Sequence, residues 1–229
     1  MNAFPNEKYM PIILILIRGP IFLRKMMLFY SMNYLAHAFL SFNNKEILAG
    51  NMISDFVKGK KKFDYSLGIQ QGIYLHRLID NFTDFHPITA GAKQLFRPEY
   101  RLYSGAFVDV VYDHFLARDD NQFEGYGGLG NFTRITYRQL EENHFHLPPT
   151  FQKVFPYMKK QNWLYNYRSR EGIKKSFGGL VYRAKYLHES DIAFEIFNMH
   201  YDELKNCYNS FFPELKSYVL SALDGLTTQ

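Results

Sequence analysis

The stretch SLGIQQGIYLHRLIDNFTDFHP, residues 66–87, decides the fold class of this chain. Its apolar residues, among them Ile69, Ile73 and Ile79, recur at the three- and four-residue spacing of one face of an α-helix. The serine at its start is a good N-cap, and the proline at its end closes a helix. The stretch therefore predicts a long amphipathic helix that carries histidine and aspartate among apolar side chains.

The segments on either side of this stretch carry the same helical signals. We expect further helices over residues 44–56, 88–96, 104–118, 131–143, 150–161, 170–186, 190–210 and 213–224. Asn44, Ser104 and Ser190 are the expected N-caps, Pro98 stops one helix, and Pro213 opens the last. Alternating β-branched runs joined by Asn-Gly or Asp-Gly turns, which would signal strands, are absent. We therefore predict an all-α, single-domain helical bundle over residues 32–229.

Residues 119–131 are polar and rich in glycine, and we expect them to form the least ordered loop of the domain. The loop is not a phosphate cradle, because phosphate-binding glycine loops need a preceding strand and a following helix with Lys-Ser/Thr.

Composition excludes several classes of protein. The chain has 229 residues, of which 47% are hydrophobic and 18% aromatic, so it is long enough to bury a large core rich in ring contacts. The single cysteine, Cys207, excludes an internal disulfide and a thiolate metal site, and it suits the reducing cytoplasm. The net charge of +5 favours an anionic partner.

Residues 1–31 form an N-terminal extension that the bundle does not include. Its apolar runs resemble a membrane segment, but Arg18, Pro20, Arg24 and Lys25 interrupt them. A spanning helix needs about 20 nearly uncharged apolar residues, and a signal peptide needs an unbroken apolar region before a cleavage site. We therefore expect no stable membrane insertion, and we expect the domain to begin at Met32.

Histidines and aspartates interrupt the apolar faces of two predicted helices. His76, Asp80 and Asp84 follow one another at four-residue intervals and so lie in one stripe along their helix. Asp109 and Asp113 repeat that spacing on a later helix. Such a stripe can face a metal ion or a phosphate group, whereas solvated salt links and packed core histidines are the alternative.

His114 follows Asp113 directly and lies about 100° further round its helix. The two side chains therefore cannot both point at one ion from a regular helix. One of them would bind the ion, and the other would contact a ligand of the ion or pack in the core. Which of the two binds is left open.

A third segment places Asp55 among Ile53, Phe56 and Val57, with His37 lying 18 residues upstream. A carboxylate among apolar side chains is costly to bury unless it is paired or bound to a metal. Imidazole and carboxylate ligands suit a divalent cation such as Mn²⁺, Fe²⁺ or Zn²⁺. Such an ion orients a phosphate and lowers the pKa of its bound water.

The ordered set of strings around these residues resembles the acyl carrier protein phosphodiesterases. The strings are MNYLAH (32–37), AGNMISDFVKG (49–59), GIYLHRLIDNFTD (72–84), DVVYDHFL (109–116) and WLYNYR (163–168). The resemblance covers about residues 32–215 and implies an all-α fold related to the HD-type phosphohydrolases.

The resemblance also implies a reaction that depends on a divalent metal, usually Mn²⁺. The reaction is hydrolysis of the phosphodiester that joins a carrier-protein serine to 4′-phosphopantetheine, which converts holo-acyl carrier protein to the apo form. The His-Asp doublet of the wider superfamily is absent, because Arg77 follows His76. The acidic partner must therefore come from elsewhere, with Asp55, Asp80 and Asp113 available.

These considerations give a set of candidate site residues. The metal candidates are His37, Asp55, His76, Asp80, Asp113 and His114. The catalytic candidates are Asp55, His76, Asp80 and Arg77, whose guanidinium offers paired donors to a phosphate. We expect Asp84 and Asp109 either to contact the metal ligands without binding the ion or to face the phosphate.

Lys58, Lys60, Lys61 and Lys62, called here the lysine cluster, follow the Asp55 segment directly. They can dock an acidic carrier protein beside the site, or they form a solvated loop. Nucleic acid is not an expected partner, because no recognition motif accompanies the cluster.

Two other functions remain open at this stage. One is an HD-like phosphohydrolase acting on a small phosphoester or nucleotide. The other is a non-catalytic helical module that binds an acidic protein or a membrane surface.

Overall fold

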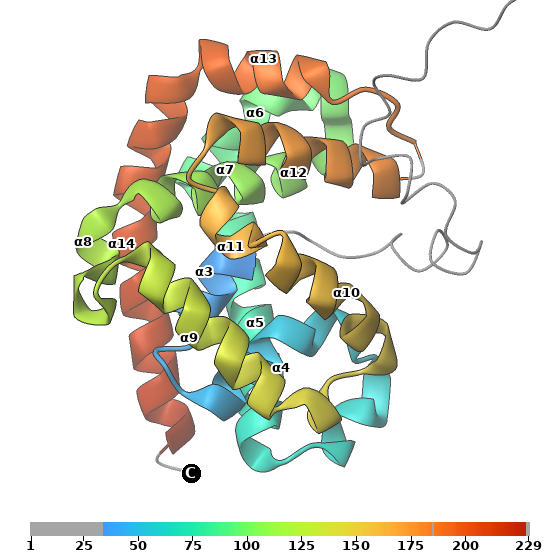
Figure 1. The fold of residues 1–229 in the computed structure, drawn as a ribbon. Helices are drawn as coiled ribbons and strands as arrows, with labels where there is room; N and C mark the ends of the chain where they lie inside the picture. The colour runs from blue at the N-terminus through green and yellow to red at the C-terminus, as the bar shows by residue number, and fades with distance from the viewer. Residues whose placement is uncertain (1–33, 185, 228–229) are drawn as a thin grey trace, which may run out of the picture.

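The computed structural model describes residues 34–184 and 186–227 (Figure 1). The predicted extension over residues 1–31 and the expected domain start at Met32 lie outside these described residues. Within them the chain forms helices and turns and contains no strand, so the all-α prediction is confirmed.

The α-helices of the described residues are, in chain order, α3 Tyr34–Phe39, α4 Lys45–Ile53, α5 Leu67–Phe85, α6 Pro87–Tyr100, α7 Ser104–Arg118, α8 Asp120–Phe123, α9 Leu129–Glu142, α10 Pro149–Lys160, α11 Trp163–Asn166, α12 Arg170–Arg183, α13 Asp191–Met199 and α14 Tyr201–Thr227. Short 3₁₀ turns join several of them, namely η1 Ser54–Phe56, η2 Gly59–Asp64, η3 Arg101–Tyr103, η4 Glu124–Tyr126 and η5 His144–His146.

The helices are arranged around a central layer made by α3, α4, α5 and α7. Helix α4 packs along α5, and the short α3 lies against both α4 and α7. Helix α14 runs down one side of the molecule from α13 to the C-terminus, contacting α5, α6 and α7 on the way (Figure 1). Helices α12 and α13 cover α7 and α6 at the end opposite that terminus (Figure 1).

Aromatic rings fill much of the core, as the composition predicts. Phe39 meets the rings of Phe123, Phe132 and Phe212, so α3 is joined to α8, α9 and α14. Such ring pairs add to the free energy gained by burying their apolar area. None of the described helices combines the length and the apolar character that crossing a membrane requires.

The helix starts follow the predicted caps in two of four cases. The Asn44 side chain accepts the backbone N–H groups of the first turn of α4, and the Ser66 hydroxyl does the same for α5. Ser104 is instead the first residue inside α7, and Ser190 precedes α13 without a capping bond. The positions of these two helix starts are right, but the capping contacts are not made.

The predictions drawn from the two prolines are wrong. Pro98 lies inside α6 and Pro213 lies inside α14, while the chain breaks instead at His200, between α13 and α14. A proline leaves the carbonyl four residues earlier without its helical partner. Here those positions, Gln94 and Asn209, are exposed, so water can satisfy the carbonyls and both helices continue.

The glycine-rich segment 119–131 is more regular than a loop. It contains α8 and η4, and α9 already begins at Leu129. The side chain of Phe123 is fully buried against Phe39 and Phe132, which anchors the segment to the core. One phenylalanine thus outweighs the local glycine signal.

Candidate metal centre

The centre of the site depends on an unusually close approach of α4 and α5. A Cβ atom placed on Gly50 would lie 2.1 Å from the carbonyl oxygen of Ile69, and one on Gly72 would lie 2.3 Å from that of Ile47. Only glycine fits at either position, because these separations are below any van der Waals contact. The close approach brings the backbone carbonyl of Asn51 on α4 to within 2.8 Å of His76 Nδ1 on α5.

Asn51 is fully buried and fixes the ring of His37. Its amide nitrogen donates to the carbonyl oxygen of His37 at 2.8 Å and to the hydroxyl of Ser41 at 3.2 Å. These two bonds set the orientation of the amide, so its oxygen must be the acceptor that faces His37 Nδ1 at 2.7 Å. His37 therefore carries its proton on Nδ1.

His76 is held in the same way. Its Nδ1 faces a backbone carbonyl, which can only accept, so this nitrogen is also the protonated one. The two rings stack with their centroids 4.0 Å apart and their planes inclined by 17°. Both neutral imidazoles consequently present an Nε2 lone pair to the same place.

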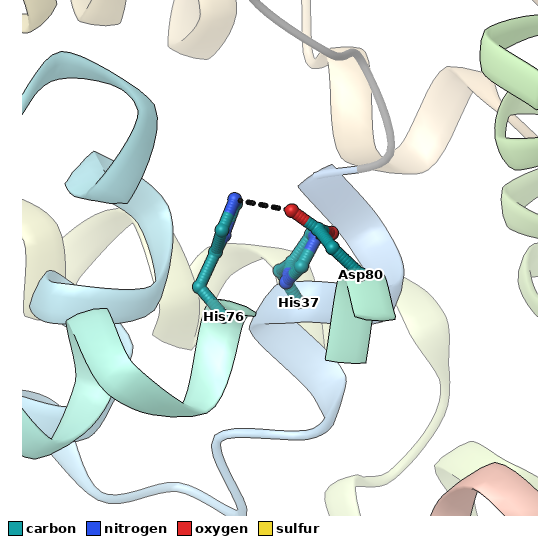
Figure 2. A group of neighbouring side chains, drawn as sticks. All are labelled: His37, His76 and Asp80. Atoms are coloured by element: carbon teal, nitrogen blue, oxygen red, sulfur yellow. Dashed lines mark ion pairs between the residues drawn. The ribbon is translucent and has the colours of Figure 1, made fainter. Parts of the chain in front are cut away.

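Asp80, one turn after His76 on α5, faces both lone pairs. Its carboxylate oxygens lie 3.2 Å from His37 Nε2 and 3.1 Å from His76 Nε2. Figure 2 shows the three side chains converging from α3 and α5. One donor atom from each residue can be chosen so that all three lie within 4.8 Å of one another.

This arrangement fits a divalent cation. Neither Nε2 atom makes a hydrogen bond of good geometry within the described residues, although both are buried. Two nitrogen lone pairs and a carboxylate that face one another repel unless a proton or a metal ion lies between them. A carbonyl or amide oxygen behind each imidazole is the usual support of a metal-binding histidine. The donor set of two imidazoles and one carboxylate suits several divalent metals.

The pKa values follow the same electrostatics. Burial lowers the pKa of His37 below its usual value, and the nearby His76 lowers it further. Burial also acts to lower the pKa of His76, but the carboxylates of Asp55 and Asp80 outweigh it and raise this pKa to about 10. Burial acts to raise the pKa of Asp80, yet the two imidazoles hold it below its usual range. In the absence of a metal the shared proton therefore resides mainly on His76.

Asp55 also approaches His76 Nε2, although it is not one of the group of three. Its carboxylate is 3.4 Å from His76 Nε2, and its side chain is 28% exposed. It comes from η1, directly after α4, so it contacts both the imidazole and solvent. That position suits a further ligand or a proton acceptor.

Asp113 is not brought to the three donors and instead fixes α3. Its two carboxylate oxygens accept the backbone N–H groups of Leu35 at 3.0 Å and Ala36 at 2.8 Å. Burial raises the pKa of Asp113, and these two hydrogen bonds oppose that rise. A carboxylate at the first turn of a helix is favoured by the unpaired N–H groups there. Asp113 thereby positions the start of α3, where His37 follows Ala36 directly.

His114 is not brought to the three donors either. Its Nδ1 faces the carbonyl oxygen of Tyr167 at 2.7 Å and its Nε2 faces the hydroxyl of Tyr201 at 3.1 Å. Both ring nitrogens are thus engaged, and the ring is packed against Phe115 and Phe197. Neither ring nitrogen of His114 is therefore directed toward Asp80.

Asp84 and Asp109 lie further out. Asp84 is exposed and forms an ion pair with Lys93 at 2.7 Å. Burial raises the pKa of Asp109 well above its usual value, and the charges of Asp80 and Asp84 raise it further. Arg77 follows His76 directly and is exposed.

The lysine cluster begins three residues after Asp55, across the bend that η1 and η2 make. Three of its side chains are exposed and the fourth, on Lys62, lies over the ring of Phe63 at 4.9 Å. None of the four forms an ion pair within the part of the chain that the structure describes. The neighbouring Phe63 and Leu67 are also exposed.

Comparison with known proteins gives the family of the chain. The family model described as acyl carrier protein phosphodiesterase matches residues 32–215, which include every residue of the site. The chain belongs to the acyl carrier protein phosphodiesterase family. The family resemblance predicted from the ordered strings is thus confirmed.

Curated relatives of this family match most of the chain. A protein named acyl carrier protein phosphodiesterase from Enterobacter sp. (strain 638) is 33% identical over 184 residues, which is 80% of this chain and 95% of the relative. Proteins of the same name from Klebsiella pneumoniae and Photorhabdus laumondii are 33% and 30% identical, over 95% and 92% of their lengths. No solved structure matches the chain, so the predicted relation to the HD-type phosphohydrolases stays a prediction.

Asn51 is the residue of the site that the sequence reasoning did not assign. It lies within the quoted string 49–59, between Ile47, Leu48 and Ala49 on one side and Met52 on the other. A single amide on an otherwise apolar helix is a signal for a buried hydrogen-bonding role. The sequence contains that signal, but the hydrogen-bond partner of the Asn51 amide depends on how α4 packs against α3.

Proposed function

We propose that this protein is a divalent-metal-dependent phosphodiesterase that hydrolyses the 4′-phosphopantetheine phosphodiester of holo-acyl carrier protein to give apo-acyl carrier protein. One observation carries the proposal. The Nε2 lone pairs of His37 and His76 and the carboxylate of Asp80 converge on one point in a chain of this family. Families with this name act on a phosphodiester, which is a bond that a metal-assisted site can hydrolyse.

The metal that we assign to His37, His76 and Asp80 is Mn²⁺, because a mixed nitrogen and carboxylate donor set accepts it. Such an ion, held by these three residues, would polarise a phosphate oxygen and lower the pKa of the attacking water.

The remaining residues take roles that their surroundings support. Asp55 is partly exposed beside His76 and accepts the proton of the attacking water. Asp109, whose raised pKa favours the protonated carboxyl, donates a hydrogen bond to a phosphate oxygen that a carboxylate would repel. Arg77 offers paired N–H donors to the same phosphate from the rim. The oxygen of water bonds to phosphorus, the bond from phosphorus to the carrier serine oxygen breaks, and the proton taken up by Asp55 passes to that serine oxygen.

We assign two of the six metal candidates to supporting roles in this scheme. Asp113 orients α3 through the backbone N–H groups of Leu35 and Ala36, and His114 packs against Tyr167 and Tyr201. Asp84 neutralises Lys93 near the site.

Docking of the carrier protein is assigned to the lysine cluster. Its exposed ammonium groups lack acidic partners in the described residues, and the exposed Phe63 and Leu67 beside them add apolar contact area. Such a surface suits an acidic partner, whose approach it would steer. We assign the reaction to the cytoplasm, since the single cysteine suits a reducing compartment.

The test of this proposal uses the variants Asp55→Ala and His76→Ala. Each should remove nearly all hydrolysis of holo-carrier protein in the presence of Mn²⁺ while circular dichroism reports unchanged helical content. The matched controls are Asp64→Ala, an exposed carboxylate at the end of η2, and His146→Ala, an exposed histidine. Retention of more than about a tenth of the activity, a barrier change below about 1.4 kcal/mol, would count against a catalytic metal role for the residue.

A further inference from the structure

The strongest unexplained feature outside the metal centre is the side chain of Arg183, the last residue of α12. Its exposed fraction is 7%, and it is the only buried arginine or lysine among the described residues. Its Nη2 atom is fully enclosed and has no hydrogen-bond partner within residues 34–184 and 186–227. No carboxylate of the described chain forms an ion pair with it.

Burying a guanidinium without a hydrogen-bonding or charged partner costs free energy. The group is an obligatory donor of five N–H groups and cannot escape by losing its proton at ordinary pH. Removing a single unpaired charge from water costs several kcal/mol even after the protein relaxes. Burial indeed acts to lower the pKa of Arg183, in the direction that disfavours the charged form. An anion is therefore missing from the surroundings that the structure describes.

The neighbouring groups do not supply that anion. The groups near enough to act on the charge of Arg183 are the phenols of Tyr34 and Tyr167. Burial raises the pKa of Tyr167 well above its usual value, so this phenol is neutral at physiological pH. The carbonyl end of α12 offers only a partial negative charge of about half an electron. Neutral phenols and a helix end can line an anion site, but they do not balance a full charge.

We propose that Arg183, beside Tyr34 and Tyr167, forms a binding site for a small oxyanion, either phosphate or a carboxylate. Arginine pairs with both through two parallel N–H···O bonds, which would satisfy the enclosed Nη2. The enclosure favours a compact anion over a bulky one. Tyr34 lies one turn before His37 on α3, so the anion site adjoins the helix that carries a metal-centre ligand, and it is separate from the three donors themselves.

The test measures binding of sodium phosphate and of sodium acetate by the full chain, by calorimetry, against sodium chloride at equal ionic strength. The wild type should bind at least one of the two oxyanions, and which one binds identifies the source of the anion. Arg183→Met should weaken that binding tenfold or more. Arg138→Met is the matched control, because this arginine is exposed, and it should bind as the wild type does.

A second measurement uses only the wild-type protein, so it does not depend on how a variant folds. In wild-type protein labelled with ¹⁵N-arginine, the guanidinium signal that is most protected from exchange should shift on addition of the bound oxyanion. Thermal unfolding of Arg183→Met without added oxyanion should also occur at a higher temperature than for the wild type, since an unpaired buried charge has been removed. Absence of oxyanion binding by the wild type, or equal binding by wild type and Arg183→Met, would overturn the proposal.

Discussion

Replacement of Asn51 by leucine should damage metal binding without touching a metal ligand. The two side chains have similar volumes, but leucine removes the acceptor of His37 Nδ1 and the donor to the His37 carbonyl and to Ser41. Each buried group left without a partner costs about 1–3 kcal/mol. Because the Ser41 hydroxyl still donates to the His37 carbonyl, the main orphan is His37 Nδ1–H. We expect a loss of unfolding free energy of about 1–3 kcal/mol.

The effect on the metal is separate from this loss of stability. Without the amide oxygen, His37 is free to move its proton to Nε2, which removes one lone pair from the site. Loss of such a supporting partner typically lowers metal affinity about 10- to 100-fold. Calorimetric titration with Mn²⁺ measures the affinity, and ¹⁵N spectra of the imidazole report which nitrogen carries the proton.

Ser41→Ala is the matched control for Asn51→Leu. It removes a buried hydrogen bond of Asn51 but leaves the contact between the Asn51 amide oxygen and His37 Nδ1. It should therefore lower stability while leaving Mn²⁺ affinity close to that of the wild type. If Asn51→Leu folds and binds Mn²⁺ as tightly as the wild type with its His37 proton still on Nδ1, the account of how the site is oriented is wrong.

Three further predictions address the partner, the domain and the core. Changing all four residues of the lysine cluster to glutamate should lower kcat/KM on holo-carrier protein and weaken or reverse the decline of kcat/KM with salt, because exposed charges are screened beyond about 8 Å at physiological ionic strength. Hydrolysis of a small phosphodiester is the control. Equal kcat/KM for the wild type and the variant at low salt would show that the cluster is a solvated loop. A chain that begins at Met32 should fold and stay active, because the family match begins there; an insoluble or inactive product would show that residues 1–31 are needed. Burial lowers the pKa of His114 from 6.5 to about 4 in the folded protein. As the pH falls, the unfolded chain therefore protonates this histidine before the folded chain does. The free energy of unfolding should fall by about 3 kcal/mol from pH 6.5 to pH 4. Urea unfolding across that range measures the fall, and an identical fall in His114→Phe would contradict the assignment.

The helices were largely predictable from local signals in the sequence. Asn44 and Ser66 form the capping bonds that their residue types favour, and the apolar period around Ile73 follows one buried face. The failures came where tertiary contacts decided the outcome. Whether Pro98 or Pro213 breaks a helix depends on the exposure of the residue four positions earlier, and sequence patterns do not give that exposure.

The candidate site was predictable in part for a similar reason. The four-residue interval between His76 and Asp80 is a property of one helix, and the structure does bring these two together. The places of Asp113 and His114 depend instead on which helices surround α7. Asp113 meets the start of α3, and His114 meets Tyr167 from a segment 53 residues later. Spacing along a chain carries no information about such partners.

The most direct measurement of the central claim is the intact mass of a holo-acyl carrier protein after incubation with this protein and Mn²⁺. The account predicts loss of the whole 4′-phosphopantetheine group, which leaves the unmodified serine of the apo form. It also predicts that this loss disappears when Mn²⁺ is chelated or when Asp80 is replaced by alanine. An unchanged carrier mass with Mn²⁺ present, or complete loss of the group despite the Asp80→Ala substitution, would contradict it.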